Sequence, residues 1–165
     1  MGVKILCVLT FALALAANAS AQTKISGTVS CAKPDQAHAL EVGDRPGHML
    51  IVQQGKCTWS KPMEIADTQT KEDVATMTID SRGNKSTERG YVVGTTTSGD
   101  KFFVRIQATS TLKDGVVETD EGKWTFTGGT GKLKGIKGGG TFKGKAGPDG
   151  AVVEEVEGEY QLPGK

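Results

Sequence analysis

The sequence predicts an all-β protein, a single antiparallel barrel of about eight strands. The chain has 165 residues with 23 glycines and only 5 prolines, and threonine is frequent. After an apolar N-terminal segment, no stretch keeps the apolar period of about 3.6 residues that an amphipathic helix requires. Short β-rich runs separated by turn residues recur instead, at a spacing typical of an all-β sandwich or barrel.

The N-terminal segment, residues 1–21, is interpreted as a secretion signal. Lys4 precedes an apolar run over residues 5–17, and Ala19-Ser20-Ala21 fits a small-x-small cleavage site. The run is too short to span a bilayer comfortably, although an uncleaved anchor is the alternative. We therefore expect one domain, residues 22–165, that is secreted or periplasmic and contains no membrane span.

Cleavage would remove Cys7 and leave two cysteines, Cys31 and Cys57. Two thiols in an exported chain predict a single disulfide between them. The competing interpretation is a metal-binding or nucleophilic thiol. An oxidising compartment and the lack of a Cys-x-x-Cys pair favour the disulfide.

The mature chain offers a series of candidate strands. Each run is rich in β-branched or aromatic residues and ends at a cluster of turn-forming residues. The runs are residues 24–31, 37–42, 48–55, 72–80, 87–97, 101–112, 116–127, 139–145 and 151–162.

Parity predicts which side chains face inward, because a shift of one residue turns every side chain of a strand to the other face. A three-residue loop at Lys113-Asp114-Gly115 and another at Ser98-Gly99-Asp100 both keep the even-numbered, apolar residues together. The pairs predicted across these loops are Leu112–Val116, Ile106–Gly122, Val104–Trp124, Phe102–Phe126, Thr96–Phe102, Gly94–Val104 and Val92–Ile106. Gly94 would then leave room for the Trp124 ring.

The last hairpin turns through residues 146–150, a sequence rich in glycine and proline. It should pair Lys145 with Ala151 and Lys143 with Val153. The even positions, from Phe142 to Tyr160, would face inward. The odd positions would place a lysine strand beside an acidic strand on the outside, so that the lysine run of residues 123–145 is neutralised within the sheet rather than free for a polyanion.

A glycine-rich corner is the most distinctive stretch. It begins with Gly128-Gly129-Thr130-Gly131, continues through a short basic and apolar turn, and ends in Gly140-Thr141-Phe142. Over residues 124–145 the chain resembles the allene oxide cyclase and dirigent type of β-barrel. The resemblance implies a calycin-like barrel of eight antiparallel strands whose apolar interior holds hydrophobic ligands or steers reactive intermediates. No catalytic residue of that family matches a position here.

Charge and motifs exclude several classes of partner. The 20 basic and 19 acidic residues nearly balance, and loss of Lys4 leaves the mature chain formally neutral. This argues against nucleic acid or an anionic membrane as the main partner. The sequence contains no dinucleotide fingerprint, and we expect no cofactor. His38 and His48, with Glu41 and Asp44 between them, are weak metal candidates, because glycine and proline in this stretch predict a polar loop instead.

Two acidic residues are the candidates for proton chemistry. Glu118 and Asp120 fall on the even face, which otherwise points inward, but they lie near a turn and could form a solvated rim. If they are buried, desolvation would raise their pKa values and suit them to acid–base work.

The leading hypothesis is a secreted barrel that binds a small apolar molecule. The interior side chains would be Phe102, Val104, Ile106, Trp124, Phe126 and Tyr160. One alternative is a structural or surface protein with a filled barrel. The other is an isomerase or cyclase-like enzyme on the same barrel, which we regard as the less favoured hypothesis.

Overall fold

The computed structural model describes residues 22–114 and 116–163, and the segment predicted to be a secretion signal, residues 1–21, lies outside them. Two short 3-10 helices, η1 (Gly131–Leu133) and η2 (Pro148–Gly150), accompany the strands. The described residues contain no helix long and apolar enough to cross a membrane. The strands are β1 (Thr23–Cys31), β2 (Gln36–Glu41), β3 (His48–Lys61), β4 (Glu64–Ile65), β5 (Thr68–Arg82), β6 (Lys85–Thr96), β7 (Lys101–Lys113), β8 (Val116–Gly129), β9 (Lys137–Ala146) and β10 (Val152–Gln161).

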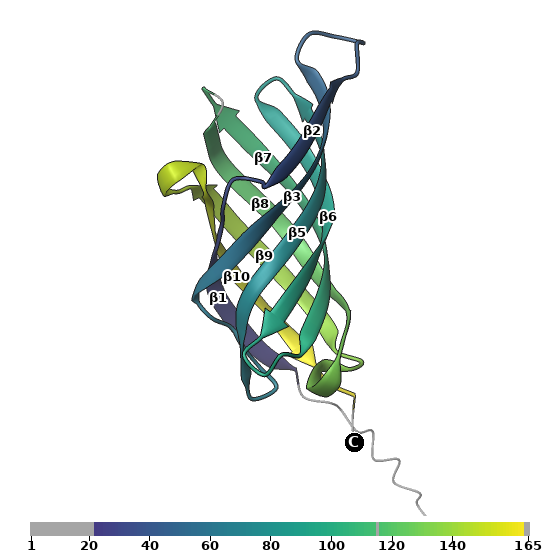
Figure 1. Ribbon diagram of the computed structural model, residues 1–165, viewed down its shortest axis with the longest axis vertical. Coiled ribbons are helices and arrows are strands. Elements are labelled where there is room, and N and C mark those ends of the chain that lie inside the picture. Colours follow the sequence, from purple (N-terminus) through teal and green to yellow (C-terminus); the bar gives the residue numbers. More distant parts are fainter. Residues whose placement is uncertain (1–21, 115, 164–165) are drawn as a thin grey trace, which may run out of the picture.

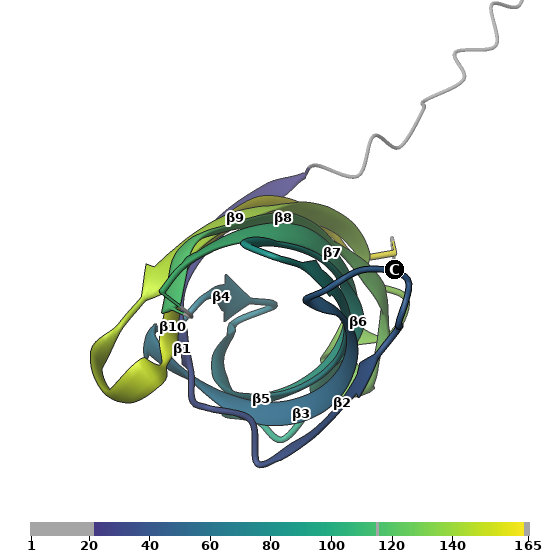
Figure 2. The same cartoon turned by 90° about the horizontal axis from the view of Figure 1, so that it is seen from above.

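The sheet closes on itself, which confirms the predicted all-β barrel. Its strand order is β2-β3-β1-β10-β9-β8-β7-β6-β5-β4, and an additional pairing of β3 with β5 completes the ring. All strands except β2 and β4 belong to this ring of eight, and every pairing is antiparallel. Figures 1 and 2 show the long, tilted strands and the ring that they form. Closure leaves the ring strands without free edges, which suppresses edge-to-edge association.

The long strand β3 closes the barrel, because it pairs with strands from both ends of the sheet order. Its C-terminal half pairs with β1, and its N-terminal half pairs with β2 on the same edge, while β5 occupies the other edge. Cys31 of β1 lies opposite Cys57 of β3, and the predicted Cys31–Cys57 disulfide is present. Its loop of 26 residues constrains the unfolded chain, an effect of roughly 3 kcal/mol on the chain-entropy model.

The hairpin registers differ from prediction by two residues. Between β6 and β7, Phe102 pairs with Gly94 rather than Thr96, and Val104 pairs with Val92. The three-residue loop begins one residue earlier than predicted, because the Thr96 N–H donates to the Asp100 carbonyl oxygen at 2.9 Å. A shift of two residues preserves parity, so the predicted inward face is unchanged.

The β7–β8 hairpin reaches its register by another route. Leu112 pairs with Val117, so the loop is one residue shorter than predicted, and Asp114 adopts φ 53°, as tight hairpin turns require. Such a loop alone would reverse parity. A register shift between Thr111 and Leu112 restores it, because Thr111 pairs with Thr119 and leaves Glu118 as an extra residue.

Beyond this bulge the pairs are Ile106–Trp124 and Val104–Phe126. The last hairpin is also displaced by two residues, since Lys145 pairs with Val153 and the Gly147 N–H donates to the Ala151 carbonyl oxygen. On its outer face Lys143 lies opposite Glu155 on one side and Glu121 on the other. The register therefore places Lys143 between two acids, whereas Lys145 has an apolar partner.

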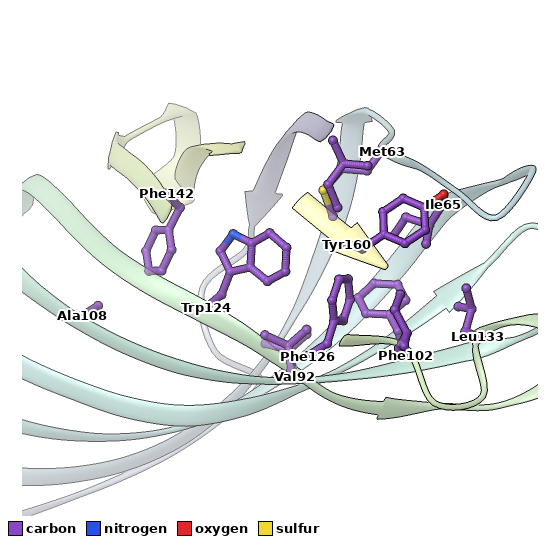
Figure 3. Close-up of a cluster of buried hydrophobic side chains, with 13 residues drawn as sticks. Met63, Ile65, Val92, Phe102, Ala108, Trp124, Phe126, Leu133, Phe142 and Tyr160 are labelled. Atoms are coloured by element: carbon purple, nitrogen blue, oxygen red, sulfur yellow. The ribbon is translucent and has the colours of Figure 1, made fainter. Parts of the chain in front are cut away.

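One end of the barrel is filled by large side chains (Figure 3). The Phe126 ring meets Phe102 edge to face at a centroid distance of 6.1 Å and Trp124 at 5.0 Å. Ile65 and Leu133, from β4 and η1, have no exposed surface and close this end. The segment carrying β4 lies inside the ring when the barrel is viewed along its axis (Figure 2).

Two glycines make room for these rings. A Cβ at Gly94 would overlap the Phe102 ring, and one at Gly158 would lie 2.5 Å from Trp124 Cζ2. The expectation that Gly94 accommodates Trp124 is therefore wrong, because the shifted register places Gly94 beside Phe102 and gives Gly158 the role beside Trp124.

Candidate functional site

Beyond the packed end, which β4 and η1 close, the barrel is hollow. A cavity of about 390 Å³ runs through the interior, a volume within the usual range for small-molecule sites. Much of its wall is apolar and comes from β3, β5, β6, β7 and β8. Its apolar members include Ile51, Met77, Ile79, Val92 and Ala108.

Five of the interior residues predicted from parity border this cavity: Phe102, Val104, Ile106, Trp124 and Phe126. Tyr160 also faces inward and is 9% exposed, but it belongs to the packed end. Its hydroxyl accepts a hydrogen bond from the Ala66 N–H at 3.0 Å, so it anchors the segment that closes the barrel. Both tryptophans of the chain, Trp59 and Trp124, border the cavity.

A row of polar residues crosses the barrel interior toward the end opposite the packed end. Ser86 pairs with Ser110, Ser110 with Asp120, Asp120 with Gly144, and Gly144 with Glu154. Because directly paired residues point to the same face of a sheet, this row faces the cavity, and all but Gly144 border it. Gly144 leaves space for the Glu154 side chain, whose Cγ would lie 2.9 Å from a Cβ at position 144.

Two serines form hydrogen bonds with two of the interior carboxyls. The Ser86 hydroxyl donates to Glu88 Oε1 at 3.1 Å, and Ser110 Oγ lies 2.5 Å from Glu88 Oε1 and 3.1 Å from Asp120 Oδ1. A hydroxyl has one proton to donate but can also accept. Ser110 can therefore serve both carboxyls at once when Asp120 is protonated and donates to it.

Burial raises the pKa of these acids. For Asp120, which is 7% exposed, desolvation and then the charge of Glu88 raise the pKa to about 6, against a smaller lowering by Ser110. For Glu154, which is partly buried, desolvation raises the pKa to about 8, followed by the charges of Asp120, Glu88 and Asp73. The carboxyls thus sense one another across the cavity.

Asp73 is a further acid in the cavity wall. It lies on β5 between Cys57 of β3 and Gly94 of β6, and it is 6% exposed. Desolvation raises its pKa to about 7, and the Trp59 indole opposes this only in part. Asp73 Oδ1 and Trp59 Nε1 are both buried, and neither makes a hydrogen bond of good geometry, although the indole lies close enough to lower the pKa of Asp73. Buried polar atoms in native proteins rarely stay unpaired, so these two atoms mark a place where a ligand or water is expected.

The two acidic residues predicted as candidates for proton chemistry lie in different environments. Asp120 faces the cavity, whereas Glu118 is exposed at the β7–β8 bulge and does not border it. Sequence reasoning did not single out Glu88, Asp73 or Glu154 as site residues. Glu154 did fall on the predicted inward face of its strand, and that parity was the available signal.

The two histidines lie apart from this site and from each other. His38 is exposed on β2 opposite Val52, while His48 is buried at the start of β3. His48 Nδ1 contacts Asp44 Oδ1 at 2.5 Å, and His48 Nε2 contacts Asp80 Oδ1 at 3.0 Å. Among the described residues, no three His, Cys, Asp or Glu side chains are grouped to hold a metal ion. The contacts of His48 with Asp44 and Asp80 connect the β2–β3 loop to β5.

Two solved structures are similar to this chain. The pterocarpan synthase dirigent protein GePTS1 matches with a TM-score of 0.50 and 13% sequence identity over 88% of this chain and 87% of that one. A protein of unknown function from the DUF3224 family of Shewanella oneidensis MR-1 matches with a TM-score of 0.47 and 16% identity over 87% of this chain and 100% of that one. No protein-family model matches the chain, and no curated protein matches its sequence.

At 13% identity the likeness to the dirigent protein concerns the fold alone. It confirms the dirigent-type barrel that the glycine-rich corner predicted. The allene oxide cyclase part of that resemblance has no counterpart in these two structures.

Proposed function

We propose that this protein is exported and binds a small, largely apolar molecule inside its barrel. The observation that carries the proposal is the cavity of about 390 Å³ with a mostly apolar wall. A barrel with a purely structural role has no need of such a space, because larger side chains would fill it and stabilise the fold.

Export is supported by two independent features. Residues 1–21 carry Lys4, then an apolar run and a small-x-small site. The Cys31–Cys57 disulfide fits an oxidising compartment. The proposed location is therefore the periplasm or the extracellular space.

Intrinsic fluorescence offers a direct binding test, because Trp59 and Trp124 both border the cavity. An apolar anilinonaphthalene dye should bind saturably, quench tryptophan emission by energy transfer, and be displaced by fatty alcohols. Ala108→Phe places a ring in the cavity and should abolish binding. Thr109→Phe, one residue away on the exposed face, should not. Equal binding by both variants would refute an interior site.

A second candidate function is acid–base catalysis of an isomerisation. It is favoured by one observation, the buried Asp120 carboxyl, whose pKa burial raises to about 6 beside an apolar wall. A β,γ-unsaturated ketone is a suitable probe, since its conjugation needs one proton moved from the α to the γ carbon. Turnover lost in Asp120→Asn but kept in Glu118→Gln would support catalysis. Dye binding without turnover would leave ligand binding as the function.

A further inference from the structure

We infer that the ligand is an amphiphilic organic cation, an amine whose ammonium group lies among the interior carboxyls and whose apolar body lies against the aromatic part of the cavity. This inference rests on the proposed function and adds the chemical class of the ligand. It follows from the charges in the cavity, from their position relative to the apolar wall, and from the poorly hydrogen-bonded Asp73.

The first step is the charge inventory of the cavity. Four acidic side chains border it, one from each of four ring strands: Asp73 of β5, Glu88 of β6, Asp120 of β8 and Glu154 of β10. The remaining ring strands contribute neutral groups there, among them Ser110 of β7, Gln53 of β3 and Val29 of β1. Among the described residues, Lys33 is the one basic residue that borders the cavity, and it is exposed in the loop between β1 and β2.

These acids have no internal counter-ion. In the described part of the chain, no lysine, arginine or histidine forms an ion pair with any of the four. The serines satisfy Glu88 and Asp120 but carry no charge. Buried acids without a cation repel one another, as the effects of Asp120, Glu88 and Asp73 on Glu154 show. A bound cation would replace that repulsion with attraction.

The second step is the separation of polar and apolar wall. Along β7 the residues bordering the cavity run from Phe102 through Ile106 to Ser110, and along β8 they run from Phe126 through Trp124 to Asp120. Phe102 and Phe126 therefore lie toward the closed end, and Asp120 and Glu88 lie toward the opposite end. Asp73 borders the aromatic part of the wall, because it pairs with Gly94, the partner of Phe102, and its charge raises the pKa of Glu154. A ligand with an apolar body and one charged head fits this polarity in one orientation.

The third step is an acceptor that the protein satisfies poorly. Asp73 Oδ1 is buried in the cavity wall and makes no hydrogen bond of good geometry, although the nearby Trp59 indole lowers the pKa of Asp73. An ammonium group carries up to three N–H donors and no acceptor, which suits a site that offers carboxyl oxygens. A carboxylate ligand would add like charge, and an alcohol would supply one donor without neutralising the acids.

A metal ion fits less well than an organic cation. The described His, Cys, Asp and Glu side chains do not converge in any group of three that could coordinate one ion. The carboxyls are spread over β5, β6, β8 and β10, around a space large enough for an organic group. Much of the surrounding wall is also apolar, which a hydrated ion does not need.

The test compares three probes with the same apolar body: octylamine, octanol and octanoate. Binding to the intact, disulfide-bonded protein is measured by isothermal titration calorimetry at pH 7, below the micelle-forming range. Octylamine should bind at least about tenfold more tightly than either of the others. The Ala108→Phe variant serves as a control for surface binding and should remove the signal.

Proton release gives an independent readout that needs no variant. A cation favours the ionised carboxyls, so octylamine should expel protons from Asp73 and Glu154, whose pKa values are raised to about 7 and about 8. The binding enthalpy should then differ between buffers of different ionisation enthalpy. Octylamine affinity should rise from pH 5 to pH 8, because the amine stays charged while the carboxyls ionise.

Variants test whether the interior carboxyls cause the preference for octylamine over octanol. Glu154→Gln combined with Asp120→Asn should reduce the preference for octylamine over octanol to below about threefold, with octanol binding retained. Glu118→Gln, at an exposed acid outside the cavity, should leave the preference intact. Retained octanol binding shows that the double variant is folded.

The outcomes separate this inference from the proposed function. Octanol or octanoate binding as tightly as octylamine, or octylamine binding without proton release, would overturn the inference and leave an apolar-ligand barrel. Absence of binding by all three probes would also overturn it, and the dye titration described above then decides whether the proposed function falls as well.

Discussion

The interior carboxyls should make the protein less stable as pH rises from about 5 to about 7. Burial raises the pKa of Asp73 to about 7 and that of Glu154 to about 8, from 3.8 and 4.5. Groups with raised folded-state pKa values bind protons in the native state that the unfolded chain has already released. Their contribution to stability is complete below the unfolded-state pKa and is lost as pH rises through the folded-state pKa.

The size of the effect follows from proton counting. A carboxyl protonated in the native state and ionised in the unfolded state lowers the free energy of unfolding by about 1.4 kcal/mol per pH unit. Across the interval from pH 5 to pH 7, Glu154 alone then accounts for about 2.5 kcal/mol. Asp44, whose pKa is held near 2 mainly by His48, and Asp80, whose pKa Arg82 lowers, titrate below this interval and do not oppose the trend.

Urea unfolding at pH 5, 6 and 7, followed by tryptophan emission, measures this slope. Glu154→Gln removes one titrating group and should flatten the profile. Glu155→Gln, the exposed neighbour on the outer face, should leave it as steep as in the parent protein. A midpoint that rises toward pH 7, or identical slopes in all three proteins, would refute the burial of ionisable groups on which the site depends.

Three further predictions concern the fold. Trp124→Ala removes a ring that is 5% exposed and should lower the free energy of unfolding by about 3–5 kcal/mol. Lys123→Ala on the outer face should change the free energy of unfolding by less than about 0.5 kcal/mol. Comparable small losses in denaturant unfolding of both variants would mean that the predicted inward face is wrong. Alkylation without reductant should leave the mass of the native protein unchanged, and labelling of Cys31 and Cys57 would contradict the disulfide. The lysine run of β8 and β9 should not hold heparin at physiological salt, since acids lie beside it, and elution well above that salt would show an independent basic patch.

Sequence parity identified the inward face of the hairpins but not their register. Period-two alternation survives a displacement of two residues, so Val104, Trp124 and Phe126 point inward in either register. The register itself depends on turn hydrogen bonds, such as the one from Thr96 to Asp100, and on the bulge at Glu118. Nothing in the local sequence distinguishes a three-residue loop from a shorter loop followed by a bulge, because both satisfy the apolar pattern.

Most of the acidic site was beyond sequence reasoning for a different reason, although parity placed Asp120 and Glu154 on the inward face. Asp73, Glu88, Asp120 and Glu154 come from four strands and meet only when the sheet closes through β3 and β5. Each of them alone resembles a solvated charge, which is the usual state of an acid in a strand. The short strand β4 was also missed, since a two-residue pairing leaves no periodic signal, and with it the closure of one barrel end by Ile65.

The hollow and the filled parts of the barrel arise from the same strands through a gradient in side-chain size. Along β7 the inward side chains are large from Phe102 to Ile106 and small at Ala108 and Ser110, while the strand spacing in the sheet does not change. Large rings meet across the barrel at one end, and small or polar groups cannot reach one another at the other. Replacing the serines and acids with leucine would extend the packed end and stabilise the protein near neutral pH, where those acids are a burden. Ionisable groups that lower stability, in the part of the barrel that is left empty, support the proposal that this part holds a ligand.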